Sequence, residues 1–115
     1  MITVYGIKNC DTVKKACRWL DAKGLEYELH DFRIDGITKD QVTSWARTLG
    51  WEALLNRRST TWRNLGAKEK SALTESKAIS LMVKNPTLIK RPVVNIGKRY
   101  LLGFSEEIFL MKLTS

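Results

Sequence analysis

The strongest constraint on the fold is a change of hydrophobic period within the first twenty residues. Residues 2–7 are apolar, aromatic or β-branched, which predicts a short buried strand. After a polar turn, apolar positions recur at helical spacing and predict a helix from Asp11 to Lys23, ended by Gly24. Residues 26–32 read as a second strand. Because a helix forms the crossover, the two strands are expected to be parallel.

The rest of the chain alternates between helical and strand patterns. Thr38 and Gln41 resemble a capping box, and a helix is expected from there to Gly50. A short helical turn and then a polar loop at 56–61 are expected next, followed by a helix from about Thr74 to Asn85-Pro86. Residues 92–96 and 99–102 flank Gly97-Lys98 and predict a β-hairpin. Ser105 is expected to cap a last helix.

This order, β-α-β, then helices, then β-β-α, predicts an α/β fold in one domain over residues 1–115. The core is expected at about 1–35 and 87–115, and an all-helical insertion at about 36–86. The insertion belongs to the same α/β unit and is not expected to be an independent domain.

Composition excludes several classes of protein. The formal net charge is +8, which favours anionic partners or a solvated basic surface. One histidine and two cysteines are too few for a usual zinc site, so no metal is expected. No apolar run is long enough to span a membrane, and residues 1–10 lack the layout of a signal peptide. We expect a cytoplasmic, monomeric protein that does not bind membranes.

Cys10 is the candidate nucleophile. It stands where the first strand passes into the helix, and unpaired amides at that helix end carry partial positive charge. Those amides and nearby Lys8 would stabilise a thiolate and bind a negative substrate group. Asn9, Asp11 or Thr12 is expected to cap the helix.

Three other features need weighing. Cys17 lies on the apolar helix face and is expected to be a small buried hydrophobe. The Arg91-Pro92 bond precedes a strand and is either an ordinary trans bond or a cis turn opposite Cys10, where Arg91 would add charge for an anion. The arginines around the polar loop, Arg57, Arg58 and Arg63, either form a solvated face or close over the site.

Four ordered blocks carry a family resemblance: YGIKNCDTVKKACRWL, LLNRRSTTWRNL, LIKRPVV and LLGFSEEI. With them the chain resembles the arsenate reductase (ArsC) family, and most closely its YffB-like branch beside the Spx regulators. The resemblance implies a thioredoxin-like fold with a helical insertion, Cys10 as the nucleophile and Arg91 in the anion site. It makes Pro92 the proline that is cis in this fold. Arg58 is the better match to a second anion-site arginine, with Arg57 as the alternative register.

The chain also departs from the family pattern. Arsenate reductases of this type carry a third arginine after the last hairpin, where this chain has Gly103 or its neighbour, and usually a histidine shortly before the cysteine. Many Spx proteins have C-x-x-C, whereas the fourth position here is Val13. An intramolecular C-x-x-C switch is therefore excluded.

The resemblance leads us to expect an enzyme, a glutathione-dependent thiol oxidoreductase with one working cysteine. Cys10 and Arg91 are its catalytic candidates, and glutathione is a co-substrate rather than a bound cofactor. The residues expected to bind substrate or glutathione are Lys8, Asn9, Asp11, Thr12, Arg58 and Pro92. One alternative is arsenate reduction linked to glutathione or glutaredoxin. The other is an Spx-like, non-enzymatic module that binds RNA polymerase; direct binding of nucleic acid is not expected.

Overall fold

The computed structural model describes residues 2–113, which form two compact units. The core unit comprises residues 1–36 and 91–115, and the helical unit residues 37–90. The insertion expected at about residues 36–86 falls mostly within this helical unit. The elements of the core unit are β1 (Ile2–Gly6), α1 (Asp11–Ala22), β2 (Tyr27–Asp31), α2 (Phe32–Asp35), β3 (Val93–Ile96), β4 (Arg99–Leu102) and α8 (Glu106–Leu113).

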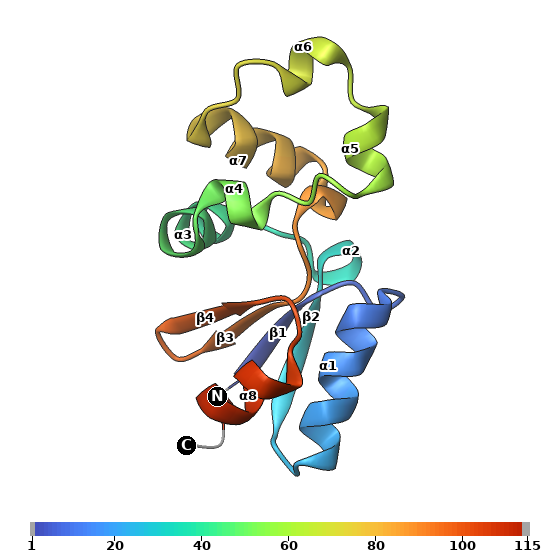
Figure 1. The fold of residues 1–115 in the computed structure, drawn as a ribbon, viewed down its shortest axis with the longest axis vertical. Coiled ribbons are helices and arrows are strands. Elements are labelled where there is room, and N and C mark those ends of the chain that lie inside the picture. Colours follow the sequence, from blue (N-terminus) through green and yellow to red (C-terminus); the bar gives the residue numbers. More distant parts are fainter. Residues whose placement is uncertain (1, 114–115) are drawn as a thin grey trace. The chain divides into compact units, whose positions relative to one another are not determined.

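Within the described residues, the strands of the core unit form one four-stranded sheet in the order β2-β1-β3-β4 (Figure 1). β1 pairs with β2 in parallel, as the helical crossover predicted, and β3 runs antiparallel to both β1 and β4. The β3–β4 hairpin turns at Gly97, whose φ of 61° is unfavourable for other residues. The predicted α/β class and thioredoxin-like arrangement are confirmed.

The main hydrophobic cluster of this unit lies on one face of the sheet. Val4 of β1 pairs directly with Val94 of β3, so their side chains project from the same face. The buried α1 residues, spaced by the helical period, pack against them, and Phe109 of α8 joins the same cluster. Because α1 is fixed to the sheet along its apolar face, its first turn is held at the end of β1.

Gly6, the last residue of β1, allows α1 to approach the sheet closely. A Cβ atom built at Gly6 lies 2.6 Å from Cγ2 of Val13, a separation that real Cβ atoms do not show. Val13 is 1% exposed and its β-branched side chain has little rotational freedom. The glycine is therefore needed for close packing at the start of α1.

Gly6→Ala is expected to lower the free energy of unfolding by about 1–3 kcal/mol, because overpacking forces α1 to shift. Urea denaturation measures the change. In a double-mutant cycle with Val13→Ala, the two losses should sum to more than the loss of the double variant, because removing the valine methyls relieves the clash. Strictly additive losses would show that the Gly6–Val13 contact is not the cause.

The helical unit contains α3 (Lys39–Leu49), α4 (Trp51–Leu54), α5 (Thr60–Asn64), α6 (Ala67–Lys70), α7 (Glu75–Lys84) and the 3₁₀ helix η1 (Pro86–Leu88). The predicted capping box is confirmed: Thr38 Oγ1 accepts from Gln41 N–H at 3.1 Å, and Gln41 accepts from Thr38 N–H at 3.0 Å. The apolar core of the helical unit comes chiefly from α3 and α7, and Trp45 and Met82 are almost fully buried there.

One part of the predicted polar loop is helical instead. Ser59 caps α5 by accepting a hydrogen bond from Trp62 N–H at 3.1 Å. The sequence NRRSTTWRN lacks a helical run of apolar residues, so its periodicity predicted no helix. The cap and the packing of Trp62 under cationic side chains stabilise this short turn instead.

Candidate active site

Cys10 occupies the N-cap position of α1. Its backbone is extended, with φ −83° and ψ 124°, and its carbonyl accepts the first helical hydrogen bond from Lys14 N–H at 3.0 Å. Its own N–H donates to Ile7 O at 3.0 Å. Both ends of the residue are thus tied to backbone, and the half-buried side chain is held at the helix start.

The predicted caps were wrong: neither Asn9, Asp11 nor Thr12 is the N-cap. Asp11 and Thr12 already belong to α1, and Asn9 lies in the turn before it. The cysteine therefore occupies the position where a serine or aspartate would usually accept the free helical amides. The Cys10 side chain makes no regular capping hydrogen bond, but the amides of the first turn act on its sulfur and lower the pKa of the thiol.

The pKa of the Cys10 thiol is lowered from its ordinary value. Partial burial raises the pKa, but it is outweighed by hydrogen bonds from Val13 N–H, the Arg91 side chain and Thr12 N–H, and by the positive charge of Arg91. All of these groups favour the thiolate over the thiol. The arrangement can therefore supply a nucleophilic sulfur and, around it, donors for an anion.

Arg91 reaches Cys10 because of the way β3 begins. The Arg91–Pro92 peptide bond is cis, and the buried Pro92 accepts a hydrogen bond from Gly103 N–H at 2.8 Å through its carbonyl. Val93, which follows, pairs with Tyr5 of β1. The pairing of β3 with β1 thus brings the 91–92 segment to the end of β1 from which Cys10 follows.

A buried carboxylate holds the turn before Cys10. Asp31, at the end of β2, is only 4% exposed and accepts hydrogen bonds from Lys8 N–H at 3.0 Å and Arg33 N–H at 2.8 Å. Burial raises the pKa of this carboxyl. The opposite effect is larger and comes from those two N–H groups, from the charge of Lys8 and from Ile34 N–H, so the net shift of the pKa is downward. Asp31 is ionised at neutral pH and positions the backbone of Lys8, two residues from the nucleophile.

Sequence reasoning missed Asp31 because it read the residue as one more position of a strand. The available signal was an aspartate directly before Phe32, at the end of an otherwise alternating segment. Such a residue at a strand end is placed to accept amides of the neighbouring turn. Lys8 and Asn9 themselves expose their side chains to solvent.

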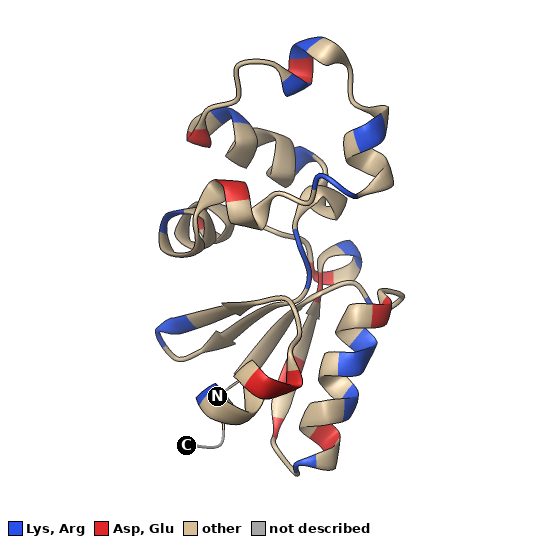
Figure 2. Cartoon of the chain, viewed as in Figure 1, with Lys and Arg blue, Asp and Glu red and all other residues tan. Residues whose placement is uncertain are grey.

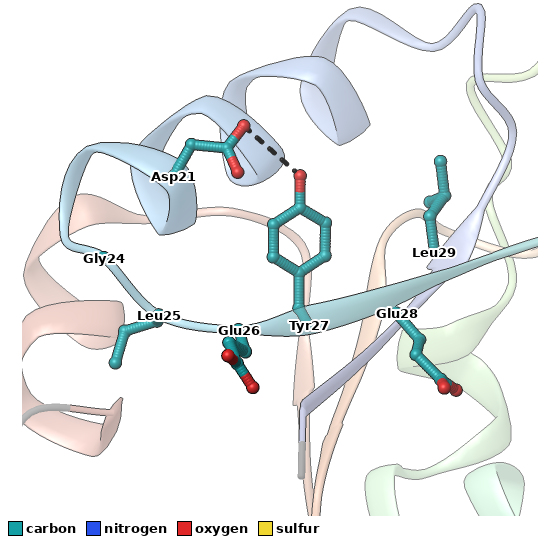
Figure 3. A pocket seen from close by; sticks show the side chains of 7 residues that line it. All are labelled: Asp21, Gly24, Leu25, Glu26, Tyr27, Glu28 and Leu29. Atoms are coloured by element: carbon teal, nitrogen blue, oxygen red, sulfur yellow. Dashed lines mark hydrogen bonds between the residues drawn. The ribbon is translucent and has the colours of Figure 1, made fainter.

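Cys17 has the opposite electrostatics. Burial and the negative charge of Asp21 raise the pKa of its thiol, although a hydrogen bond with Tyr27 acts the other way. Figure 3 shows Tyr27 standing between β2 and α1, with its hydroxyl donating to Asp21 Oδ2 at 3.4 Å. Both cysteines are free thiols. Cys17 is therefore a protonated residue that packs against the core from the apolar helix face, as predicted, but it is only partly buried.

The groove around Tyr27 is lined by Asp21 and residues 24–29, and none of the predicted site residues is among them (Figure 3). Its carboxylates make it acidic, unlike the surroundings of Cys10. The single histidine, His30, lies on β2, where its Nε2 is 2.7 Å from Gly36 O and its ring is tilted against Tyr5. We therefore give neither feature a part in the chemistry of Cys10.

The candidate arginines of the insertion lie in the helical unit. The Arg57 guanidinium lies over the Trp62 ring at 5.7 Å, while Arg58 donates its backbone N–H to Asn56 Oδ1 at 3.1 Å and exposes its side chain. Arg63 donates to Arg58 O at 3.2 Å. These contacts leave Arg58 the freer of the two candidates, and its approach to Cys10 stays a prediction.

Among residues 2–113, no group of three or more histidine, cysteine or acidic side chains is arranged to hold a metal ion. Within the same range, no helix is both long enough and apolar enough to cross a membrane.

Comparison with known proteins places these features in a family. The model of the ArsC family matches residues 5–111. An uncharacterised protein of Haemophilus influenzae is 50% identical over 107 residues, covering 93% of this chain and 94% of its own. The solved structure of YffB is 42% identical, with a TM-score of 0.96 and coverage of 98% and 99%. The global transcriptional regulator Spx of Streptococcus mutans is 27% identical, covering 93% of this chain and 79% of its own.

Proposed function

We propose, from the premise that this chain belongs to the ArsC family, that it is a glutathione-dependent thiol oxidoreductase with Cys10 as its one nucleophile. The observation that carries the proposal is the environment of the Cys10 sulfur. Two helix amides and the Arg91 side chain donate to it and lower its pKa, whereas the pKa of Cys17 is raised. Only one of the two thiols is thus prepared for thiolate chemistry.

The reaction proceeds by two thiol–disulfide exchanges. The Cys10 thiolate attacks the glutathione sulfur of a mixed disulfide, forms a Cys10–glutathione disulfide and releases the substrate as its thiolate. A second glutathione thiolate then attacks this disulfide, regenerates the Cys10 thiolate and leaves as glutathione disulfide. The sum of the two steps converts the mixed disulfide and one glutathione into the substrate thiol and glutathione disulfide. The substrate sulfur gains one electron, the attacking glutathione sulfur loses one, and the glutathione that arrived in the mixed disulfide stays at the disulfide level.

Glutathione resolves the intermediate because no second cysteine stands near Cys10 in the sequence. Cys17 is seven residues further along the same helix, about 10 Å at helical rise, which exceeds disulfide reach. Glutaredoxin is a further candidate for the resolving thiol. Arg91, Lys8 and the amides at the start of α1 are proposed to hold glutathione carboxylates, together with Arg58 from the resemblance.

The test uses the mixed disulfide of glutathione and 2-mercaptoethanol, with glutathione as the reductant. We expect catalysis that depends on glutathione, and an intermediate with one glutathione on the peptide that contains Cys10. Mass spectrometry of the acid-quenched reaction identifies that peptide and separates it from one that contains Cys17. Turnover no faster than the uncatalysed exchange, or an adduct confined to Cys17, would refute the proposal.

Arsenate reduction is the second candidate, because the same donors surround the sulfur that would attack an oxyanion. As(V) would gain two electrons and become As(III), as the Cys10 thiol and one glutathione are oxidised to their mixed disulfide. Complementation of an arsenate-sensitive bacterial strain tests this reaction, with the Cys10→Ser variant as the control. Failure of the wild-type chain to restore growth would leave the thiol oxidoreductase as the proposal.

A further inference from the structure

A groove of about 710 Å³ lies between α1 and the segment that leads into α8, entirely within the core unit. Thr12, Arg18 and Trp19 of α1 line one side, and Phe104 and Glu106 line the other. None of these residues except Thr12 was assigned a function from the sequence.

The groove begins beside the nucleophile. Thr12 lines it, and this residue lies in the first turn of α1, two residues after the N-cap Cys10. A molecule bound along α1 therefore has one end next to the attacking atom. The groove is placed to hold whatever is attached to the sulfur that Cys10 attacks.

The floor of the groove is aromatic and rigid. Trp19 and Phe104 are half-buried, and both pack edge-to-face against the buried Phe109, with ring centroids 5.5 Å and 4.9 Å away. Their positions are fixed by the core, so binding an apolar side chain against them requires little loss of conformational entropy. The floor thus suits an apolar residue of a ligand.

The wall formed by α1 is basic. Lys15 and Arg18 are three residues apart, so they lie on the same helix face, and both are exposed. Figure 2 shows several basic residues along α1. Among residues 2–113, neither cation has an ion-pair partner. The acidic residue on the opposite wall, Glu106, leaves a net positive groove.

The length of the groove exceeds the reach of glutathione. From Thr12 to Ala22 the helix rises about 15 Å, which equals four to five residues of extended peptide. Glutathione with its sulfur at Cys10 extends one α-linked glycine on one side, about 3.5 Å, and a γ-linked glutamate on the other, about 7 Å, whereas Arg18 is eight residues or about 12 Å along the helix. Arg18 and Trp19 therefore lie beyond it and can be reached by a longer chain.

From these features we propose that the substrate is a protein and that the groove binds its segment next to the oxidised cysteine, a segment with acidic and apolar residues. The inference rests on the proposed thiol chemistry of Cys10. Lys15 and Arg18 bind the carboxylates, and Trp19 and Phe104 contact the apolar side chain. The groove thus selects the substrate, and the Cys10 thiolate carries out the exchange.

The test compares two synthetic peptides, each carrying a glutathionylated cysteine with the same apolar residues on both sides. One has glutamates three to five positions from the cysteine, and the other has lysines there. The wild-type chain is expected to reduce the acidic peptide with a kcat/KM about tenfold higher. The Lys15→Glu/Arg18→Glu variant should lose that preference or reverse it.

The matched control is Lys98→Glu/Arg99→Glu. It makes the same change in charge at two exposed positions of the β3–β4 hairpin, outside the groove. It should keep the preference for the acidic peptide. Both double variants should reduce the mixed disulfide of glutathione and 2-mercaptoethanol at similar rates, because both make the same change in net charge, Arg18 lies beyond the small substrates and Lys15 is not among the groups proposed to hold glutathione.

The outcomes separate this inference from the proposed function. If the wild-type chain fails on the small mixed disulfide, the proposed function fails and the inference with it. If it reduces the small disulfide but does not distinguish the peptides, only the groove assignment is wrong. A preference that survives in Lys15→Glu/Arg18→Glu, or a raised KM for glutathione in that variant, would also overturn the assignment.

Discussion

Cys10→Ser is expected to abolish thiol–disulfide exchange, lowering kcat/KM for a glutathione mixed disulfide by about 10³-fold or more. The fold should persist, because Cys10 is the N-cap of α1 and serine is a preferred residue at that position, where its oxygen can accept an amide of the first turn. The nucleophile disappears, however, because a hydroxyl near a helix start remains protonated at neutral pH. The glutathione-dependent rate of reduction measures the loss.

Cys17→Ser is the matched control for this prediction, since it makes the same replacement on the same helix. Cys17 is a protonated packing residue whose hydrogen bond to Tyr27 a serine hydroxyl can replace. Its kcat/KM should stay near that of the wild-type chain. Equal losses in the two variants would point to a damaged helix rather than to a lost nucleophile, and an active Cys10→Ser variant would place the nucleophile elsewhere.

The parts of the fold that could be predicted from the sequence depend on local signals. The capping box of Thr38 and Gln41 and the cap at Ser105 are local hydrogen-bonding patterns, and both are found in the structure. The parallel pairing of β1 with β2 followed from the helix between them. These signals span a few residues, so no tertiary contact was needed to read them.

The details of the site depend on contacts between distant residues. Several polar residues near Cys10 are good caps by composition, and local preference alone cannot choose between them. Which residue becomes the N-cap is influenced by Asp31. This residue is 23 positions away from Lys8 in the sequence and holds the turn that leads into α1. The close approach of Val13 to Gly6 is likewise a contact between a helix and a strand. Arg91 beside Cys10 was expected from the family resemblance, and the pairing of β3 with β1 is its structural basis.

The second large effect is expected from replacing Arg91, the cation beside the Cys10 sulfur. Arg91→Met is expected to raise the pKa of the Cys10 thiol, because it removes both a hydrogen bond to the sulfur and a nearby positive charge. The amides of Val13 and Thr12 remain, so part of the stabilisation should survive. A rise of one pKa unit means about tenfold less thiolate at any pH well below the pKa. Alkylation by iodoacetamide, followed against pH, measures the midpoint directly.

The direction of the pH effect follows from the thiolate population. The wild-type rate should rise with pH and level off early, because its thiol ionises below the ordinary value. The rate of Arg91→Met should level off later and reach a similar plateau, since iodoacetamide is neutral and needs no cation for binding. Arg99→Met, an exposed arginine at the hairpin, should leave the midpoint unchanged. An unshifted midpoint in Arg91→Met would show that the guanidinium does not stabilise the thiolate.

Arg91 has two proposed roles, to stabilise the Cys10 thiolate and to bind a glutathione carboxylate. Rates with a glutathione substrate distinguish the second role from the first. With a glutathione mixed disulfide, Arg91→Met should remain slower than the wild-type chain even at a pH where both thiols are fully ionised, because the carboxylate partner is also lost. Arg91→Lys keeps the charge without the planar fork, so it should recover most of the pKa shift and less of the binding. If the plateau rate with the mixed disulfide is the same in the wild-type chain, Arg91→Met and Arg91→Lys, as it is with iodoacetamide, then Arg91 acts on the sulfur alone. The glutathione carboxylates must in that case be held by other groups.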